Sequence, residues 1–153
     1  MTASHQTLWD LYRQQNPDAP VAAPAGFHFC DNVEDADLCA DLVVRGIKRA
    51  TASSLAELEL VGQPVPQVGD LNLITDGSGR ARAVICTRRV DIRRLGDVDA
   101  AFAALEGEGD GSLAWWRAAH LAYYQRALAG SGIRVDDDLL VACEAFDCVL
   151  SVD

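Results

Sequence analysis

The run VGDLNLITDGSGRARAVICTRRVDIRRL, residues 68–95, constrains the fold of this chain more than any other stretch. Residues 71, 73 and 75 alternate with 72, 74 and 76, and a period of two is typical of a strand. Asp76-Gly77-Ser78-Gly79 then supplies hairpin turn chemistry. A return strand is expected from about Arg80 to Ile92. The fold must therefore contain an antiparallel pair of strands.

Helical periodicity surrounds this hairpin. Apolar spacing predicts helices over residues 4–15, 33–45 with Gly46 as a stop, 98–105 and 112–129. Residues 55–61 fit either a strand or a short helix, and residues 139–152 predict one long strand or a strand pair. No stretch of the 153 residues reads as a linker between domains. We expect one α+β domain over residues 1–153, with a core of about 27–150, an N-terminal helix of about 4–15, and a curved or closed sheet with helices outside it.

Net charge and hydropathy exclude several classes of protein. The formal net charge is −10, which opposes tight binding to a nucleic-acid duplex but allows a small basic pocket. No apolar run approaches the ~18 residues of a membrane span. The N-terminal residues lack the pattern of a signal peptide. We expect a cytoplasmic protein that does not bind membranes.

The cysteines and histidines give no zinc pattern. Five cysteines are an odd number, none pairs as C-x-x-C, and the three histidines are scattered. Structural zinc sites need closely spaced ligands. We expect reduced thiols in the core, no metal site and no cofactor.

Lys48, in RGIKRATASS, is the only lysine of this arginine-rich chain. Arginine cannot lose its proton in a protein, whereas lysine can act as a base in a pocket that lowers its pKa to about 7–8. Arg45 and Arg49 would lower it if they face the same way. Thr51 follows at a spacing of three, near enough to act with Lys48. The alternative is an ordinary exposed lysine.

The loop EGEGDGS, residues 106–112, carries three acids and three glycines. Its acids would repel a phosphate group, so a phosphate-binding loop is rejected. Asp110 or Ser112 is expected to cap the following helix, which leaves Glu106 and Glu108 unexplained. The spacing does not match a calcium loop.

Two further stretches admit both a structural and a binding interpretation. RRVDIRR, residues 88–94, is interpreted as a charged edge strand, with a local RNA-contact strip as the alternative. The helix over residues 112–129 carries four aromatic residues that cannot all face one way: Trp115, Trp116, Tyr123 and Tyr124. Some belong to the core, and one could stack on a base.

Three of these stretches resemble one family. GIKRAT resembles the G-x-K-x-x-T signature of the ASCH domain, a compact β-barrel related to the PUA fold. VGDLNLITDGSGRARAVI is similar to the strand–turn–strand that follows a P-x-V-G-D lead-in in that family. EGEGDGSLAWWRAAH resembles the acidic-loop motif of a bacterial subgroup. The resemblance covers roughly residues 27–150.

The resemblance implies RNA or a modified nucleoside as partner, and a hydrolase. One branch cleaves the amide of N4-acetylcytidine with a lysine, a threonine and a glutamate, which fall on Lys48, Thr51 and Glu108, with Glu106 as the rival glutamate. A longer relative is a ribonuclease on single-stranded RNA, which would here be metal-independent. A non-catalytic RNA- or ligand-binding regulatory module is the third possibility. The six substrate-binding candidates are Arg45, Ser53, Glu106, Asp110, Ser112 and Trp115.

The catalytic interpretation contains a conflict of charges. An ionised Glu108 beside Lys48 would raise the pKa of that lysine and oppose its use as a base. Either Glu108 is partly protonated, or Lys48 stays charged and Glu108 takes the proton. In a ribonuclease, Lys48 would stabilise phosphate charge and Thr51 or Ser53 would orient it. Ser53 replaces an arginine that is frequent in the family, which removes one cation from the pocket. The oligomeric state is left open.

Overall fold

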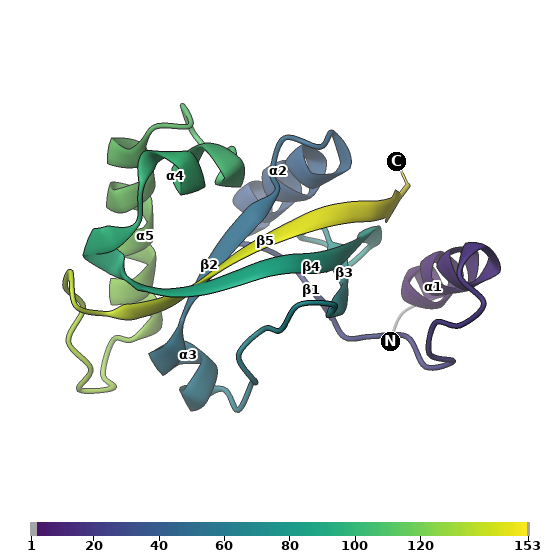
Figure 1. The fold of residues 1–153 in the computed structure, drawn as a ribbon, viewed down its shortest axis with the longest axis horizontal. Coiled ribbons are helices and arrows are strands. Elements are labelled where there is room, and N and C mark those ends of the chain that lie inside the picture. The colour runs from purple at the N-terminus through teal and green to yellow at the C-terminus, as the bar shows by residue number, and fades with distance from the viewer. Residues whose placement is uncertain (1–2, 153) are drawn as a thin grey trace.

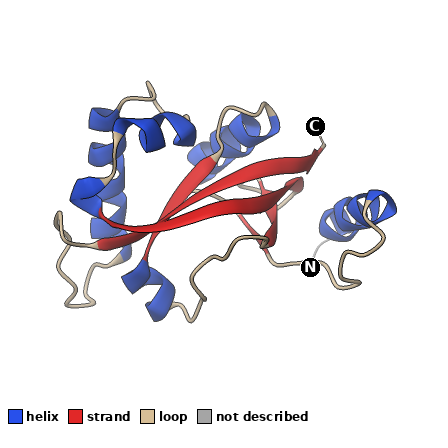
Figure 2. Ribbon diagram, viewed as in Figure 1, coloured by secondary structure: helices blue, strands red, loops and turns tan. Residues whose placement is uncertain are grey.

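A computed structural model describes residues 3–152 of the chain as one five-stranded sheet with helices packed around it (Figures 1 and 2). The strands, in sheet order, are β1 (Gly26–Phe27), β3 (Leu71–Thr75), β4 (Ala81–Arg94), β5 (Leu140–Ser151) and β2 (Ala50–Ser54). The helices are α1 (Ala3–Gln15), α2 (Val33–Val44), α3 (Leu55–Leu60), the 3-10 turn η1 (Leu95–Asp97), α4 (Ala100–Glu106) and α5 (Leu113–Ala127).

The predicted hairpin is confirmed in β3 and β4. Leu73 pairs with Val84 in antiparallel register. At the turn, the Asp76 carboxylate accepts hydrogen bonds from the backbone N–H groups of Ser78 and Arg80, both at 3.0 Å. This side chain therefore fixes the turn that sets the register of the sheet.

The sheet is α+β in class, as expected, but it is not closed among the described strands. β1 pairs with β3 in parallel, and β2 pairs with β5 at the opposite edge. The strand order does not return from β2 to β1. Register shifts interrupt β4 between Val84 and Ile85 and between Thr87 and Arg89, and such bulges bend and twist a strand. The expected barrel is thus a bent, open sheet.

The structure gives one conformation to each of the two segments that the sequence left ambiguous, residues 55–61 and 139–152. Residues 55–60 form a helix, capped by the Ser54 side chain, which accepts from the Glu57 N–H at 3.1 Å. The last strand is one long β5, paired with β4 from Ala83↔Ser151 to Arg94↔Leu140. Beyond Cys86, β4 has β5 as its partner and β3 no longer accompanies it.

The arginines of that exposed half of β4 take part in ion pairs. Arg88 contacts Asp147 at 3.0 Å, and Arg94 pairs with Asp138. Arg89 and Arg93 both lie within 4.0 Å of Asp91. The charged-edge prediction for RRVDIRR is therefore confirmed, and these cations are already paired with carboxylates.

Hydrophobic clusters cover both faces of the sheet. One cluster joins β2 and β5 to α4 and α5 through residues such as Ala50, Cys143, Phe102 and Trp116. A second joins α2 to β3, β4 and β5 and contains Phe29 and Phe146. A third packs α1 at the far end of β4, to the right in Figure 1. The edge strand β2 belongs to the first cluster through Ala50 and Ala52.

The five cysteines are free thiols. Cys39, Cys86 and Cys143 are buried as expected, whereas Cys148 is exposed and Cys30 half-buried, which corrects the expectation of five core thiols. Among residues 3–152, no helix has the length and apolar character that crossing a membrane requires.

Candidate functional site

Lys48 lies on the short segment that joins α2 to β2. Gly46 ends α2 with a φ of 75°, a conformation that glycine adopts without strain. The N–H groups of Ile47 and Lys48 then both donate to the Leu42 carbonyl, at 2.9 and 3.1 Å. This tight helix end turns the chain inward and buries the Lys48 side chain, which is 1% exposed.

The buried ammonium of Lys48 has two carboxylate partners and one carbonyl partner. Nζ donates to the Ala50 carbonyl at 2.8 Å and to Glu108 Oε2 at 3.0 Å, and lies 3.7 Å from Glu106 Oε1. It also lies 4.8 Å from the centre of the Phe29 ring. Burial acts to lower the pKa of Lys48, but Glu106 and Glu108 outweigh it, so the pKa lies above the ordinary value. Lys48 is therefore a charged group.

Gly107 brings the two glutamates onto a lysine some sixty positions away in the sequence. A Cβ on this residue would lie 2.6 Å from the Ile47 carbonyl oxygen, and its φ is 66°. The Arg49 N–H donates to the Leu105 carbonyl at 2.8 Å, which ties the end of α4 to the segment that carries Lys48. Only glycine allows this close approach.

Glu106 is the fully buried member of the pair. Its Oε2 accepts from Trp116 Nε1 at 2.5 Å and lies 2.9 Å from His120 Nε2. His120 Nδ1 lies 2.9 Å from the Trp116 carbonyl oxygen, so each ring nitrogen of His120 faces an oxygen acceptor. Burial raises the pKa of Glu106, but Lys48, His120 and Trp116 together hold it below the ordinary value.

Glu108 is the member that reaches open space, with a side chain 15% exposed. Its Oε2 binds Lys48, while its Oε1 accepts from Cys39 Sγ at 3.1 Å and faces Cys30 Sγ at 3.7 Å. Burial, the Cys30 contact and the Glu108 charge all raise the pKa of the Cys39 thiol, with the Cys30 contact the largest cause. Glu108 thus lies between the Lys48 ammonium and the thiols of Cys30 and Cys39.

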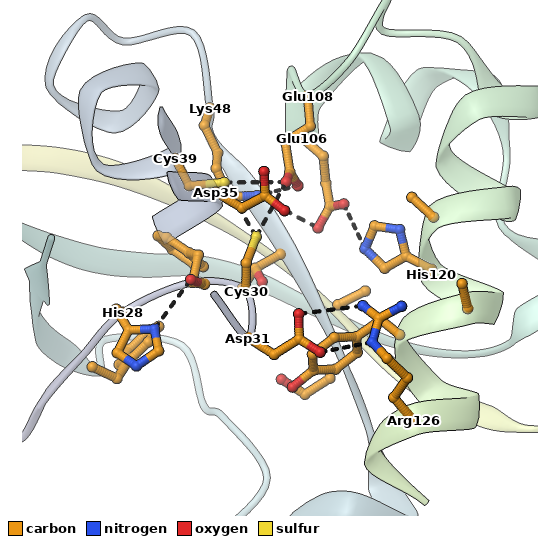
Figure 3. A pocket seen from close by; sticks show the side chains of 18 of the residues that line it. His28, Cys30, Asp31, Asp35, Cys39, Lys48, Glu106, Glu108, His120 and Arg126 are labelled. Carbon is orange, nitrogen blue, oxygen red and sulfur yellow. Dashed lines mark hydrogen bonds and ion pairs between the residues drawn. The ribbon is translucent and has the colours of Figure 1, made fainter. Parts of the chain in front are cut away.

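These groups line a cavity of about 580 Å³ over the edge strand β2. Figure 3 shows α5 on one side with His120 and Arg126, and the chain around His28, Cys30 and Asp31 on the other. Across this cavity, Arg126 binds Asp31 with two hydrogen bonds of 2.8 and 3.2 Å. That pair fastens α5 to the segment before α2.

Most of the predicted site residues meet in this cavity. Those among its lining are Lys48, Thr51, Ser53, Glu106, Glu108 and Trp115. Arg45, Asp110 and Ser112 are not among them. Arg45 is exposed and pairs with Asp41 at 3.4 Å. Asp110 and Ser112 form the start of α5, where Ser112 Oγ accepts from the Trp115 N–H at 3.1 Å and Asp110 accepts from the Ser112 N–H at 2.9 Å.

Arg49 does not tune the lysine either, because it pairs with Asp147 at 3.1 Å on the surface. Glu106 and Glu108, the two candidate partners of Lys48, both lie within ion-pair distance of it, and Glu108 is the closer.

Several cavity residues escaped prediction from the sequence. His120 ends the acidic-loop motif, four positions after Trp116, so helical spacing carried a signal for it. Cys30 and Cys39 belong to a loop and a helix, and no spacing rule brings them together. Two groups could hold a metal ion: Cys30, Cys39 and Glu108, and Glu106, Glu108 and His120. Lys48 contacts both carboxylates of the second group but only one carboxylate, that of Glu108, in the first.

The family model described as ASCH domain matches residues 26–150. The chain belongs to the ASCH domain family. This match contains both the lysine segment and the acidic loop, so the ASCH fold, a PUA-like fold, holds every residue that lines the cavity.

Solved ASCH structures share the whole architecture. The ASCH domain from Lactobacillus crispatus is 32% identical with a TM-score of 0.87, over 97% of this chain and 96% of that one. A protein from Enterococcus faecalis is 27% identical with a TM-score of 0.87, over 97% of this chain and 90% of that one. A comparison with curated proteins found no match.

Proposed function

We propose that this ASCH protein hydrolyses an amide on a small uncharged ring compound, with N4-acetylcytidine as the representative substrate. The observation that carries the proposal is the 3.0 Å ion pair between Lys48 Nζ and Glu108 Oε2, set in the wall of a cavity that Thr51 also lines. Lys48, Thr51 and Glu108 are the three residues that the amidase branch of the family matches. The cavity supplies a space where a scissile amide can meet all three.

The charge of Lys48 determines which residue acts as the base and which stabilises the oxyanion in this proposal. A lysine whose pKa is raised cannot take a proton at neutral pH. Its ammonium is suited to stabilise the negative charge that develops on a carbonyl oxygen. The base is then Glu108, whose carboxylate is partly exposed to the cavity. The proposal therefore takes the second of the two possibilities that the sequence left open, a charged Lys48 with Glu108 as the base.

The reaction runs in two stages. Thr51 Oγ1 attacks the acyl carbon while Glu108 takes the hydroxyl proton, and Lys48 stabilises the oxyanion. The C–N bond then breaks, and Glu108 returns the proton to the leaving amino group. Water adds to the acyl-threonine with the same help from Glu108. The carboxylic acid leaves and the threonine hydroxyl is restored.

The charges of the cavity favour a neutral ligand over a polyanion. Among the described residues of its lining, Lys48 is paired with two glutamates and Arg126 with Asp31. Five acids line the same cavity: Asp31, Asp35, Glu57, Glu106 and Glu108. Within residues 3–152, the lysine and arginine of the cavity and the arginines of β4 that a phosphate could meet are already paired with carboxylates.

The size and walls of the cavity suit a nucleoside. A volume of about 580 Å³ lies within the range of roughly 300–1,000 Å³ that small-molecule sites occupy. Phe27, Trp115 and Tyr123 line it and offer aromatic faces to a base.

The test is turnover of N4-acetylcytidine by the pure protein, followed as release of cytidine and acetate. Thr51→Ala should lower kcat by about 10² or more, because the nucleophile is gone. Ser53→Ala, on the same strand and in the same cavity, is the control, because loss of a binding hydroxyl should raise KM and leave kcat nearly unchanged. Equal losses in both variants would contradict the role of Thr51.

The competing functions are separated by two parallel measurements. Labelled single-stranded RNA that is cleaved in the presence of chelator, with no release of cytidine, would favour a ribonuclease. Binding of the nucleoside without turnover would favour a regulatory module. Either result would overturn the amidase proposal.

A further inference from the structure

Two thiols and a carboxylate meet at one wall of the cavity. Cys30 Sγ lies 3.5 Å from Cys39 Sγ, and Glu108 Oε1 lies 3.7 and 3.1 Å from these sulfurs. Figure 3 shows the three side chains converging, on the side of Glu108 away from His120. The proposed hydrolysis uses Glu108 but neither thiol.

The triangle has the dimensions of one face of a tetrahedral zinc site. With Zn–S bonds of about 2.3 Å and a Zn–O bond of about 2.0 Å, a tetrahedron separates two sulfurs by about 3.8 Å and a sulfur from an oxygen by about 3.5 Å. The observed separations of 3.5, 3.7 and 3.1 Å differ from these by a few tenths of an ångström. Small side-chain rotations would reach the ideal values.

The two oxygens of Glu108 are already divided between two partners. Oε2 binds Lys48 at 3.0 Å, and Oε1 faces the sulfurs. A metal ion on Oε1 therefore leaves the ion pair with Lys48 in place. The ammonium also offsets part of the negative charge that two thiolates and a carboxylate carry around one divalent cation.

Access and ligand type narrow the choice of metal. Cys30 is half-buried, and the three ligands all line the cavity, so an ion can enter from it and keep its fourth position open there. Two thiolates select soft and borderline cations such as Zn²⁺ over Mg²⁺ or Ca²⁺, which prefer oxygen. Cys30 has a φ of 65°, the one positive φ of a non-glycine residue among residues 3–152, so the chain holds this thiol in an uncommon conformation.

We propose that the chain binds one Zn²⁺ ion through Cys30 Sγ, Cys39 Sγ and Glu108 Oε1, with the fourth position open to the cavity. Binding replaces the S–H bonds of both thiols by Zn–S bonds and releases two protons to solvent. The site goes beyond the proposed hydrolysis, which uses Glu108 without a metal and therefore competes with Zn²⁺ for that carboxylate. It can be tested whether or not that reaction occurs.

The test is titration of the full chain with Zn²⁺ or Co²⁺, in a phosphine reductant and after chelator treatment. Calorimetry should give one Zn²⁺ per chain, and repetition in buffers of different ionisation enthalpy should give release of about two protons. Co²⁺ should produce a thiolate-to-cobalt absorption band and the intense visible bands of a tetrahedral site.

Matched variants distinguish this site from adventitious binding. Cys30→Ser and Cys39→Ser should each weaken Zn²⁺ binding at least 100-fold and remove the cobalt–thiolate band or halve it. Cys148→Ser, which removes an exposed thiol on β5, should bind as the wild type does. Glu108→Gln should weaken binding about 10-fold or more.

Circular dichroism shows whether each variant is folded. Should Cys39→Ser fail to fold because it lies in the core, protection provides the second readout: Zn²⁺ should slow the reaction of Cys30 with a thiol reagent in the wild-type protein. Absence of binding at one ion per chain, or binding that Cys30→Ser leaves unchanged, would overturn the proposal.

Discussion

The ammonium nitrogen of Lys48 lies 3.0 Å from Glu108 Oε2, and both side chains belong to segments that the sequence separates by sixty positions. The lysine is 1% exposed and the glutamate 15%. A charge buried to this extent needs its partners to remain in the fold. Lys48 is therefore a structural residue as well as a candidate catalytic one.

Replacing Lys48 by methionine should reduce the free energy of unfolding at pH 7 by about 3–5 kcal/mol, because two carboxylates lose their shared cation. Arg45→Met is the matched control. Arg45 pairs with Asp41 on the surface, and loss of such a pair costs about 1 kcal/mol or less. Urea denaturation measures the free energy of unfolding of both variants. Equal values would contradict the stabilising role of the Lys48 ion pairs.

The pH dependence of stability should report the same lysine. Its folded-state pKa is raised above the ordinary value of 10.5, so its contribution is fully present below pH 10.5 and is lost as the pH rises through the folded pKa. The wild-type protein should lose this part of its stability in alkali, and Lys48→Met should lack that component. Thermal melts from pH 8 to 12 would show it.

Substitutions of Glu106 and of Glu108 should affect stability and activity to different extents. Glu106→Gln removes a buried charge that Lys48 and His120 both contact, so we expect a loss of about 3–5 kcal/mol. Glu108→Gln removes one charged hydrogen bond, a loss of about 1.5–3 kcal/mol, but should abolish turnover if Glu108 is the base. Denaturation and initial rates on both variants check this, and a fully active Glu108→Gln would exclude that role.

The stability of the protein in acid should also depend on Glu106. Its pKa is held below the ordinary value of 4.5, so its contribution to stability is present above pH 4.5 and is lost as the pH falls through the folded pKa. Glu106→Gln should therefore differ most from the wild type near neutral pH, with the gap narrowing in acid.

Gly109 controls the position of Trp115 in the cavity wall. A Cβ at this position would lie 2.2 Å from atoms of the indole ring, so Gly109→Ala must displace Trp115. We expect the Kd for a nucleoside to rise about 10-fold. Gly111→Ala is a close control, because its φ of 76° resembles the 59° of Gly109 but nothing lies within 4 Å of its Cβ. Both variants carry the left-handed strain of about 1–2 kcal/mol, and Gly109→Ala adds the clash with Trp115, so both should lose stability while only Gly109→Ala weakens binding.

Glu144 offers a stabilising substitution. It is buried on β5, and its Oε1 accepts a hydrogen bond of 2.5 Å from Thr87 Oγ1. Burial raises the pKa of Glu144 above its ordinary 4.5 despite this bond. Stability from this group is present below pH 4.5 and is lost as the pH rises through the folded pKa. Glu144→Gln should raise the Tm at pH 8 and leave it nearly unchanged at pH 4, and a lower Tm at pH 8 would contradict the burial argument.

The sequence predicted those parts of this protein whose signals are local. The hairpin of β3 and β4 follows from alternation around Asp76–Gly79, and α2 follows from its periodicity and Gly46. Lys48 could likewise be identified as a candidate site residue from the sequence, because it is the only lysine of the chain. These inferences needed no knowledge of distant contacts.

The parts that escaped prediction depend on packing between distant segments. The family resemblance paired Lys48 with Glu108 or Glu106, but only the approach of Gly107 to Ile47 explains why both reach it. The sequence predicts only that Cys30 and Cys39 are reduced core thiols, because nothing in their spacing indicates that both sulfurs face Glu108. The barrel was implied by the family resemblance, whereas the sequence pattern allowed a curved or a closed sheet, because alternation predicts strands but does not determine whether the edges of their sheet meet.

The edge strand β2 has a consequence for how these molecules behave at high concentration. An unpaired edge exposes carbonyl groups that a strand from another chain can use for intermolecular pairing. Here the outward carbonyls of Ala50 and Ala52 already accept hydrogen bonds from Lys48 Nζ at 2.8 Å and Tyr124 Oη at 2.7 Å. These two side chains therefore occupy carbonyl groups that a strand from another molecule would need in order to pair with β2.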